Sequence, residues 1–249
     1  SADGANVVVK IYTGVDTSGT LKETITTART AGAWSTTAAA LVDGTYTAQV
    51  SQTDGAGNVG TALVTFTLDT TSPTAVISLP VADAKLKTAT PTISGTATSA
   101  TGDVAKVTLE FWKGTDTSGA AFKTVTDLAV ESNAWSYAVS PALSDGTWTV
   151  KATQVDDVGN SFTSTGRTFL IDTGFPTVSI SSKPATAIKE TTASFTFSTA
   201  DPDPDGAGVE VASGVASVKC QLDALEYVDC TTTASYGTVE FPLAQGLHT

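Results

Sequence analysis

Hydrophobic and polar residues alternate along much of this chain with a period of two, which is typical of β-strands that bury one face. Every second residue is apolar in Val107-Thr108-Leu109-Glu110-Phe111, and the same alternation occurs in Trp148-Thr149-Val150-Lys151-Ala152. No stretch has a convincing helical period, and turn-forming residues recur at intervals of about 8 to 12 residues. The pattern predicts an all-β protein built of sandwich domains.

The chain contains an internal repeat. Short motifs occur twice in the same order, and the two copies are separated by about 100 residues, the length of one β-sandwich domain. The paired motifs are Tyr12–Gly19 and Trp112–Gly119, Ala33-Trp34-Ser35 and Ala134-Trp135-Ser136, Asp43–Thr47 and Asp145–Thr149, Asp54–Asn58 and Asp156–Asn160, Leu68-Asp69-Thr70 and Ile171-Asp172-Thr173, and Pro73 and Pro176.

These motifs resemble the bacterial immunoglobulin-like repeats of large surface adhesins and other secreted multidomain proteins. The resemblance rests on the Asp-Gly-Thr-Tyr/Trp-Thr motifs, the Asp-x-x-Gly-Asn turns after them, the Asp…Pro linkers and the opening-strand motif Pro91–Ala97. It covers nearly the whole chain, although the third unit is divergent. It implies tandem immunoglobulin-like β-sandwich domains in an extracellular or cell-surface protein.

Alignment on the central unit predicts three domains of unequal completeness. Residues 1–73 are expected to form a repeat without its first strands, because nothing before Val7 corresponds to Val76-Ile77-Ser78. Residues 74–176 form a complete repeat, and residues 177–249 form a divergent repeat without its last strands. One interpretation is a piece excised from a longer array. The other is that the two incomplete ends complete each other between copies, because unpaired sandwich edges invite strand addition.

Two cysteines, Cys220 and Cys230, lie in strand-like segments joined by a short turn around Ala224-Leu225. This arrangement predicts a cross-strand disulfide and therefore an oxidising compartment. The alternative is a pair of buried free thiols. A zinc site has little support, because the sole histidine, His248, is distant in sequence.

The net charge of −12 and a pI near 4.3 argue against nucleic acid and against an anionic membrane as partners. No run of 18 apolar residues is present and Ser1 opens no signal-peptide pattern, so we expect no membrane insertion and a secretion signal upstream, if there is one.

We expect no enzymatic activity, because a single histidine at the end of the chain cannot serve as a base for an array of repeats. No Gly-x-Ser-x-Gly elbow, phosphate-binding loop or histidine-based zinc spacing occurs. Paired acids of the glycosidase kind are harder to dismiss from sequence. However, many acids recur in equivalent turns such as Asp43-Gly44, Asp54-Gly55 and Asp145-Gly146, which favours a structural role.

Calcium is the one cofactor that the sequence suggests. Asp201, Asp203 and Asp205 alternate with prolines before Gly206, as in oxygen-rich calcium loops, but Ala212 replaces the glutamate that would complete an EF-hand. The alternative is a solvated acidic loop. A second candidate site is the junctions, at Asp69 and Asp172, which precede the linker prolines.

The four tryptophans, Trp34, Trp112, Trp135 and Trp148, have two interpretations. They could form a platform for stacking sugars, or they could belong to the sandwich cores, which we favour because Trp148 and Tyr46 alternate with threonines in equivalent strands. Trp112, at a strand end, is the least certain.

The sequence therefore predicts a non-catalytic stalk that spaces or displays a binding region at a bacterial cell surface. Its partners would be neighbouring repeats or copies of the same protein, and surface glycans or proteins. One rival is a spacer or carbohydrate-binding module of a secreted polysaccharide-degrading enzyme. The other is a subunit of an extracellular filament or surface layer that is completed by strand exchange.

Overall fold

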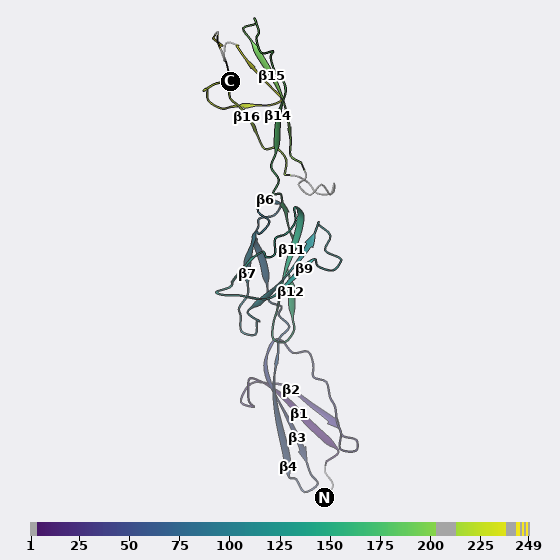
Figure 1. The fold of residues 1–249 in the computed structure, drawn as a ribbon. Coiled ribbons are helices and arrows are strands. Elements are labelled where there is room, and N and C mark those ends of the chain that lie inside the picture. Colours follow the sequence, from purple (N-terminus) through teal and green to yellow (C-terminus); the bar gives the residue numbers. More distant parts are fainter. Residues whose placement is uncertain (1–3, 203–212, 238–242, 245, 247, 249) are drawn as a thin grey trace. The chain divides into compact units, whose positions relative to one another are not determined.

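The computed structural model describes residues 4–202, 213–237, 243–244, 246 and 248. The described residues form strands β1 to β18 and no helix, which confirms the predicted all-β class (Figure 1). They accordingly contain no helix of the length and hydrophobicity needed to cross a membrane. The chain divides into two compact units: Ser1–Pro73 with Asp156–Ser161, and Thr74–Val155 with Phe162–Thr249. The predicted division into three domains stays a prediction.

Four antiparallel strands in the order β2-β1-β3-β4 form the first sheet. They are β1 (Asn6–Thr13), β2 (Leu21–Ala28), β3 (Gly44–Thr53) and β4 (Val59–Leu68). Alternation places Val7, Val9, Ile11 and Tyr46 on one face, where they are buried. Ala38 and Leu41, from the segment between β2 and β3, pack against this cluster. By contrast, β4 is exposed over nearly its whole length.

Residues 74–173 form a sandwich of two sheets, which we call the central sandwich; β7 and β11 mark its two layers in Figure 1. The smaller sheet has the order β10-β7-β5. The larger has the order β6-β13-β11-β8-β9, with β12 paired to β11 and β6 parallel to β13. The strands are β5 (Ala75–Leu79), β6 (Ala84–Leu86), β7 (Thr92–Ala97), β8 (Lys106–Lys113), β9 (Lys123–Ala129), β10 (Ala134–Ala138), β11 (Gly146–Val155), β12 (Ser161–Thr163) and β13 (Arg167–Ile171).

The core of the central sandwich lies between its two sheets. Ile77 and Ile93 from the smaller sheet meet Phe111, Trp148 and Phe169 from the larger, and all five are almost completely buried. The apolar positions of β8 face this core. Their burial explains the period-two alternation that predicted strands at 107–111 and 148–152.

The first sheet and the larger sheet of the central sandwich share individual turns and hydrogen bonds. Gly14 and Gly114 follow β1 and β8 with φ of 90° and 86°, a left-handed conformation that favours glycine. The buried hydroxyls of Thr47 and Thr149 donate to the carbonyls of these glycines at 2.9 and 2.8 Å. The repeat identified in the sequence is thus a repeat of turns and hydrogen bonds.

Residues in the ranges 177–202 and 213–236 form two smaller sheets, which we call the C-terminal sheets. One has the order β14-β15-β18 and the other is the hairpin β16-β17. The strands are β14 (Thr177–Ser182), β15 (Ala193–Ala200), β16 (Val218–Cys220), β17 (Val228–Cys230) and β18 (Thr233–Tyr236). The register of β14 shifts between Ile180 and Ser182, as that of β5 shifts between Ile77 and Leu79. The strands β14 and β5 thus share the same irregularity at equivalent positions.

Candidate functional site

Asp54 and Asp156 each bind the turn that follows them. The Asp156 Oδ1 atom accepts from the backbone N–H groups of Val158, Gly159 and Asn160 at 2.7–3.1 Å, and Oδ2 accepts from the Asn160 side chain at 2.7 Å. Asp54 receives the equivalent bonds from the backbone and side chain of Asn58. The bond from the Asn58 side chain is the largest of the causes that hold the pKa of Asp54 below its usual value. These carboxylates are structural, as the recurrence of the turns predicted.

Asp43 and Asp145 bind threonines that follow the last strand of each repeat copy. The Asp43 carboxylate accepts from the hydroxyls of Thr70 and Thr71 at 2.8 and 2.7 Å, and from the Thr70 N–H. Asp145 accepts from the Thr173 backbone and hydroxyl in the same way. The bond from Thr71, followed by that from Thr70, lowers the pKa of Asp43. Both acids therefore fix the start of a linker.

Asp172 and Asp201, which the sequence assigned to two different calcium sites, both bind the Ser213-Gly214 segment. Asp172 Oδ2 accepts from the Ser213 N–H at 2.7 Å, and Asp201 Oδ2 accepts from the Gly214 N–H at 2.6 Å. The Lys85 ammonium donates to the Ser213 carbonyl at 2.7 Å. The Ser213 side chain is the main cause that lowers the pKa of the buried Asp172. Protein donors thus satisfy the acid that was assigned to the junction.

The other candidate calcium ligands are Asp203, Asp205 and Asp69. Asp203 and Asp205 lie outside the described residues, and Asp69 accepts from the Thr71 N–H with its carboxylate and from the Asn160 side chain with its carbonyl. No group of three or more His, Cys, Asp or Glu residues that could hold a metal occurs in the described part of the chain. Calcium binding at Asp201–Asp205 and at Asp69 and Asp172 stays a prediction.

Three of the four tryptophans are core residues, as the alternation indicated. Trp112, Trp135 and Trp148 are buried, and their indole N–H groups donate to the carbonyls of Gly119, Thr96 and Ser144 at 2.8–3.1 Å. Their rings therefore form no sugar-stacking platform. The prediction is wrong for Trp34, which is 40% exposed, because no described strand pairs with its segment as β7 pairs with the strand that carries Trp135.

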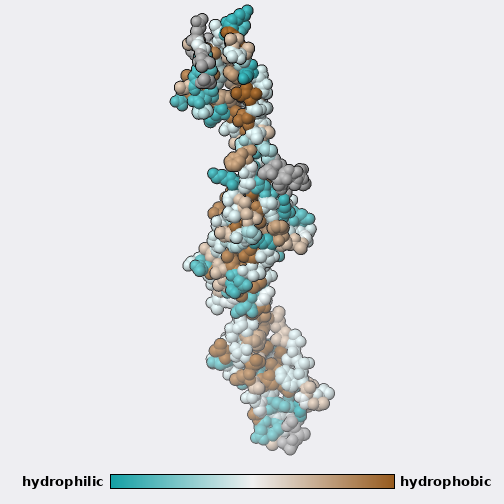
Figure 2. Space-filling model, viewed as in Figure 1, coloured by the Kyte–Doolittle hydropathy of each residue, from teal (hydrophilic) through white to brown (hydrophobic). Residues whose placement is uncertain are grey.

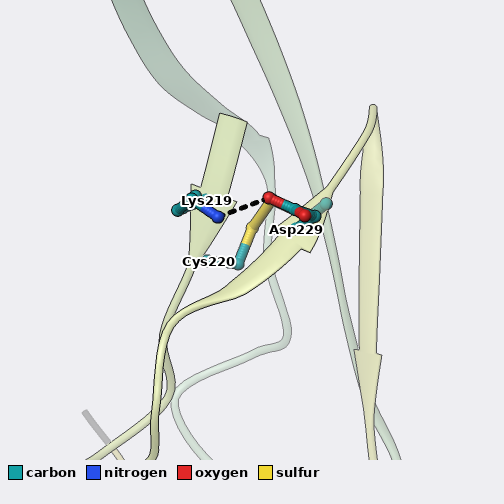
Figure 3. The surroundings of a disulfide bond; sticks show 4 residues. Lys219, Cys220 and Asp229 are labelled. Carbon is teal, nitrogen blue, oxygen red and sulfur yellow. Dashed lines mark hydrogen bonds and ion pairs between the residues drawn. A yellow bond between two sulfur atoms is a disulfide. The ribbon is translucent and has the colours of Figure 1, made fainter. Parts of the chain in front are cut away.

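Cys220 and Cys230 form the disulfide that the sequence predicted (Figure 3). The bond joins β16 to β17 diagonally, because Val218 lies opposite Cys230 and Cys220 lies opposite Val228. Beside the disulfide, the Lys219 ammonium contacts the Asp229 carboxylate at 2.6 Å. Both charged side chains are largely exposed, so the disulfide is the main constraint on this hairpin.

Sequence reasoning gave no role to His248, whose ring nitrogens contact the Asp223 carboxylate at 2.6 Å and the Ala244 carbonyl at 2.8 Å. The hydrogen bond with Asp223, then that with Ala244, raises the pKa of His248 above its usual value. Both nitrogens therefore act as donors when the ring is protonated. No motif spans the 25 positions between the partners, so sequence gave no signal for this pair or for the role of Ser213 and Lys85.

Comparisons with known proteins agree with this architecture. The family model described as "Bacterial Ig-like domain" matches residues 1–70 and 80–173, which together make up well over half of the chain. No curated protein matches the sequence.

Several solved structures are similar to the chain, among them the following three. One is a tetra-tandem repeat in the extending region of a large adhesion protein, at 23% identity and a TM-score of 0.35; the match covers 94% of this chain and 58% of that one. The fibronectin(III)-like modules of CbhA from Clostridium thermocellum match at 17% identity, 66% and 76% coverage and a TM-score of 0.33. SGBP-B of Bacteroides ovatus, in complex with a mixed-linkage heptasaccharide, matches at 16% identity, 79% and 50% coverage and a TM-score of 0.23.

Proposed function

Because the chain belongs to the family of bacterial immunoglobulin-like domains, we propose that it is a non-catalytic extracellular stalk at a bacterial cell surface. Its repeats would space or display a binding region carried by the same protein. The adhesive target and the surface to which the stalk belongs would be determined by other parts of that protein.

The observation that carries this proposal is the structural use of the polar residues that recur. Asp54 and Asp156 bind their own turns, Asp43 and Asp145 bind the threonines after the last strand, and the single histidine binds Asp223 and a carbonyl. The two cysteines are joined and offer no thiolate for nucleophilic attack. These acids, the histidine and the cysteines thus hold turns, linkers and strands in place.

A spacer of this kind must carry load without unfolding, and single-molecule stretching of the whole chain from its two ends tests it. We expect a discrete force peak for the central sandwich, followed by an extension of about 35 nm, since roughly 100 unfolded residues span about 3.5 Å each. Extension without such a peak would contradict a load-bearing role.

The same protein distinguishes the stalk from a carbohydrate-binding module. Because Trp112, Trp135 and Trp148 are buried with their indole N–H groups bonded, we expect no specific glycan binding by the chain on a glycan array. Dose-dependent binding of one defined polysaccharide would favour the carbohydrate-binding alternative instead.

A further inference from the structure

The central sandwich continues into the C-terminal sheets through a short linker, residues 172–176. The two parts belong to one compact unit. Among the described residues, however, no sheet contains strands of both parts, and the core cluster of the central sandwich includes no residue after Ile171. Hydrophobic residues lie at the surface in the view of Figure 2, and Phe175, in the linker, is 85% exposed. Neither a shared sheet nor a shared core therefore fixes this joint.

Two charged side chains at the end of the central sandwich bind both backbone groups of Ser213, which lies between β15 and β16. The Asp172 carboxylate accepts from the Ser213 N–H at 2.7 Å, and the Lys85 ammonium donates to the carbonyl of the same residue at 2.7 Å. Lys85 lies in β6 and Asp172 follows β13, and these strands pair in parallel. The Asp172 N–H extends that pairing by donating to the Leu86 carbonyl at 2.9 Å. The sheet thus holds a carboxylate and an ammonium side by side.

A third charged group binds the same segment from the side of the C-terminal sheets. Asp201 directly follows β15 and accepts from the Gly214 N–H at 2.6 Å. Gly214 has a φ of 84°, a left-handed conformation that favours glycine. The successive N–H groups of Ser213 and Gly214 therefore bind carboxylates from different parts of the chain. Hydrogen bonds to a charged group are shorter and stronger than those between neutral groups. We call Ser213-Gly214 the strap.

The matching acid of the first repeat copy shows what the strap adds. Asp69 and Asp172 each accept from the N–H two residues further on, that of Thr71 and that of Gly174, at 3.0 Å. This bond belongs to the linker and recurs in both copies. The bond from Ser213 uses the second carboxylate oxygen of Asp172, which is 7% exposed, whereas Asp69 is half-buried. The strap is therefore added to a linker turn that the repeat already provides.

We propose that the strap locks the joint, so that the central sandwich and the C-terminal sheets keep one relative orientation. Parts of a chain that share no large apolar interface ordinarily move relative to each other. The strap opposes this motion because charged side chains of both parts bind adjacent residues of one short segment. A stiff joint at this position does not require that the chain act as a stalk.

The distance between two spin labels measures how far the joint bends. Thr124→Cys on β9 and Ala187→Cys before β15 place labels at exposed positions of the two parts, and the native cysteines are joined and take no label. By pulsed double electron–electron resonance, we expect one narrow distance distribution for the labelled whole chain. Lys85→Met and Asp172→Ala should each broaden this distribution, because each removes one of the two bonds that hold the Ser213 backbone.

The chain offers matched controls for both variants. Lys87→Met removes an ammonium that is likewise exposed, two residues after Lys85, and Asp69→Ala removes the matching acid of the first repeat copy. Neither control should change the distribution. Lys85 is exposed and lies outside the core cluster, so Lys85→Met tests the strap without disturbing the fold. Equal widths for the wild type and Lys85→Met, whether both are narrow or both are broad, would overturn the proposal.

Discussion

At the scale of single residues, several acidic side chains of this protein serve as hydrogen-bond acceptors for its backbone. Asp172 illustrates the physical logic, because its buried carboxylate accepts from the N–H groups of Ser213 and Gly174 at 2.7 and 3.0 Å. Hydrogen bonds to the charged form favour that form, so the pKa of Asp172 lies below its usual value. The stability that this residue contributes therefore depends on pH.

The sign of that dependence gives a first prediction. A carboxyl group with a lowered pKa in the folded state contributes stability that is present above its unfolded pKa of about 3.9 and is lost as the pH falls through the folded value. Asp172→Asn should lower the free energy of unfolding at pH 6, and the difference from wild type should shrink as the pH falls below the unfolded pKa. Urea titrations over this range measure both values. Asp157→Asn, at an exposed turn position, is the control; a deficit for Asp172→Asn that is independent of pH would contradict this account.

Gly95 supports a second prediction at the residue scale. A Cβ atom there would overlap the carbonyl oxygen of Val76 and lie 2.7 Å from the Trp135 ring. Because the backbone of β5 cannot move without disturbing the core, Gly95→Ala should destabilise the chain by about 1–3 kcal/mol, the usual cost of overpacking. Gly119→Ala, where the new Cβ would meet nothing within 4 Å, should have no such effect. Equal thermal stabilities of the two variants would refute the steric argument.

At the scale of elements, the sequence predicted strands where apolar residues alternate, but it could not predict which strands find partners. Ala134-Trp135-Ser136 lies in β10 because β7 pairs with it, and Trp135 is 3% exposed. The matching motif Ala33-Trp34-Ser35 forms only an isolated bridge between Thr30 and Ala33, and Trp34 is 40% exposed. The two motifs are identical, so the difference comes from the strand that β7 supplies in the central sandwich.

In the candidate site, too, the sequence predicted local structure but not the partners of residues distant in sequence. Recurrence indicated correctly that Asp54 and Asp156 belong to turns, since their partners follow within four residues. It could not show that Asp172 and Asp201 share the Ser213-Gly214 segment, because the contact with Asp172 spans 41 positions and no motif records it. The sequence thus predicted the turns that these carboxylates stabilise, whereas hydrogen bonds between residues distant in sequence could be identified only from the folded structure.

The hairpin β16-β17 supports a third prediction. Its two strands have three residues each and are joined by a disulfide across a separation of 10 residues. Closing a loop of this size in the unfolded chain is worth about 2–4 kcal/mol, so Cys220→Ala with Cys230→Ala should lower the stability of the C-terminal sheets by about that amount. Urea denaturation measures it. A reductant should destabilise the wild type but not the double variant, and an equal response of both proteins would contradict the structural role of this bond.

At the scale of the whole molecule, the chain carries a net charge of −12. Like charges lie closer together in the folded chain than in the unfolded chain, so their mutual repulsion opposes the compact state. The free energy of unfolding should therefore depend on the salt concentration.

Raising the ionic strength shortens the distance over which like charges repel, from about 30 Å at 10 mM to about 8 Å at 150 mM. The apolar core of the central sandwich is little affected over this range, so the balance shifts toward the folded state. We predict that the midpoint of urea denaturation of the wild-type chain rises between these salt concentrations. A midpoint that fell as salt was added would mean that attraction between opposite charges dominates the electrostatic free energy of folding, and the repulsion inferred from the net charge would then be wrong.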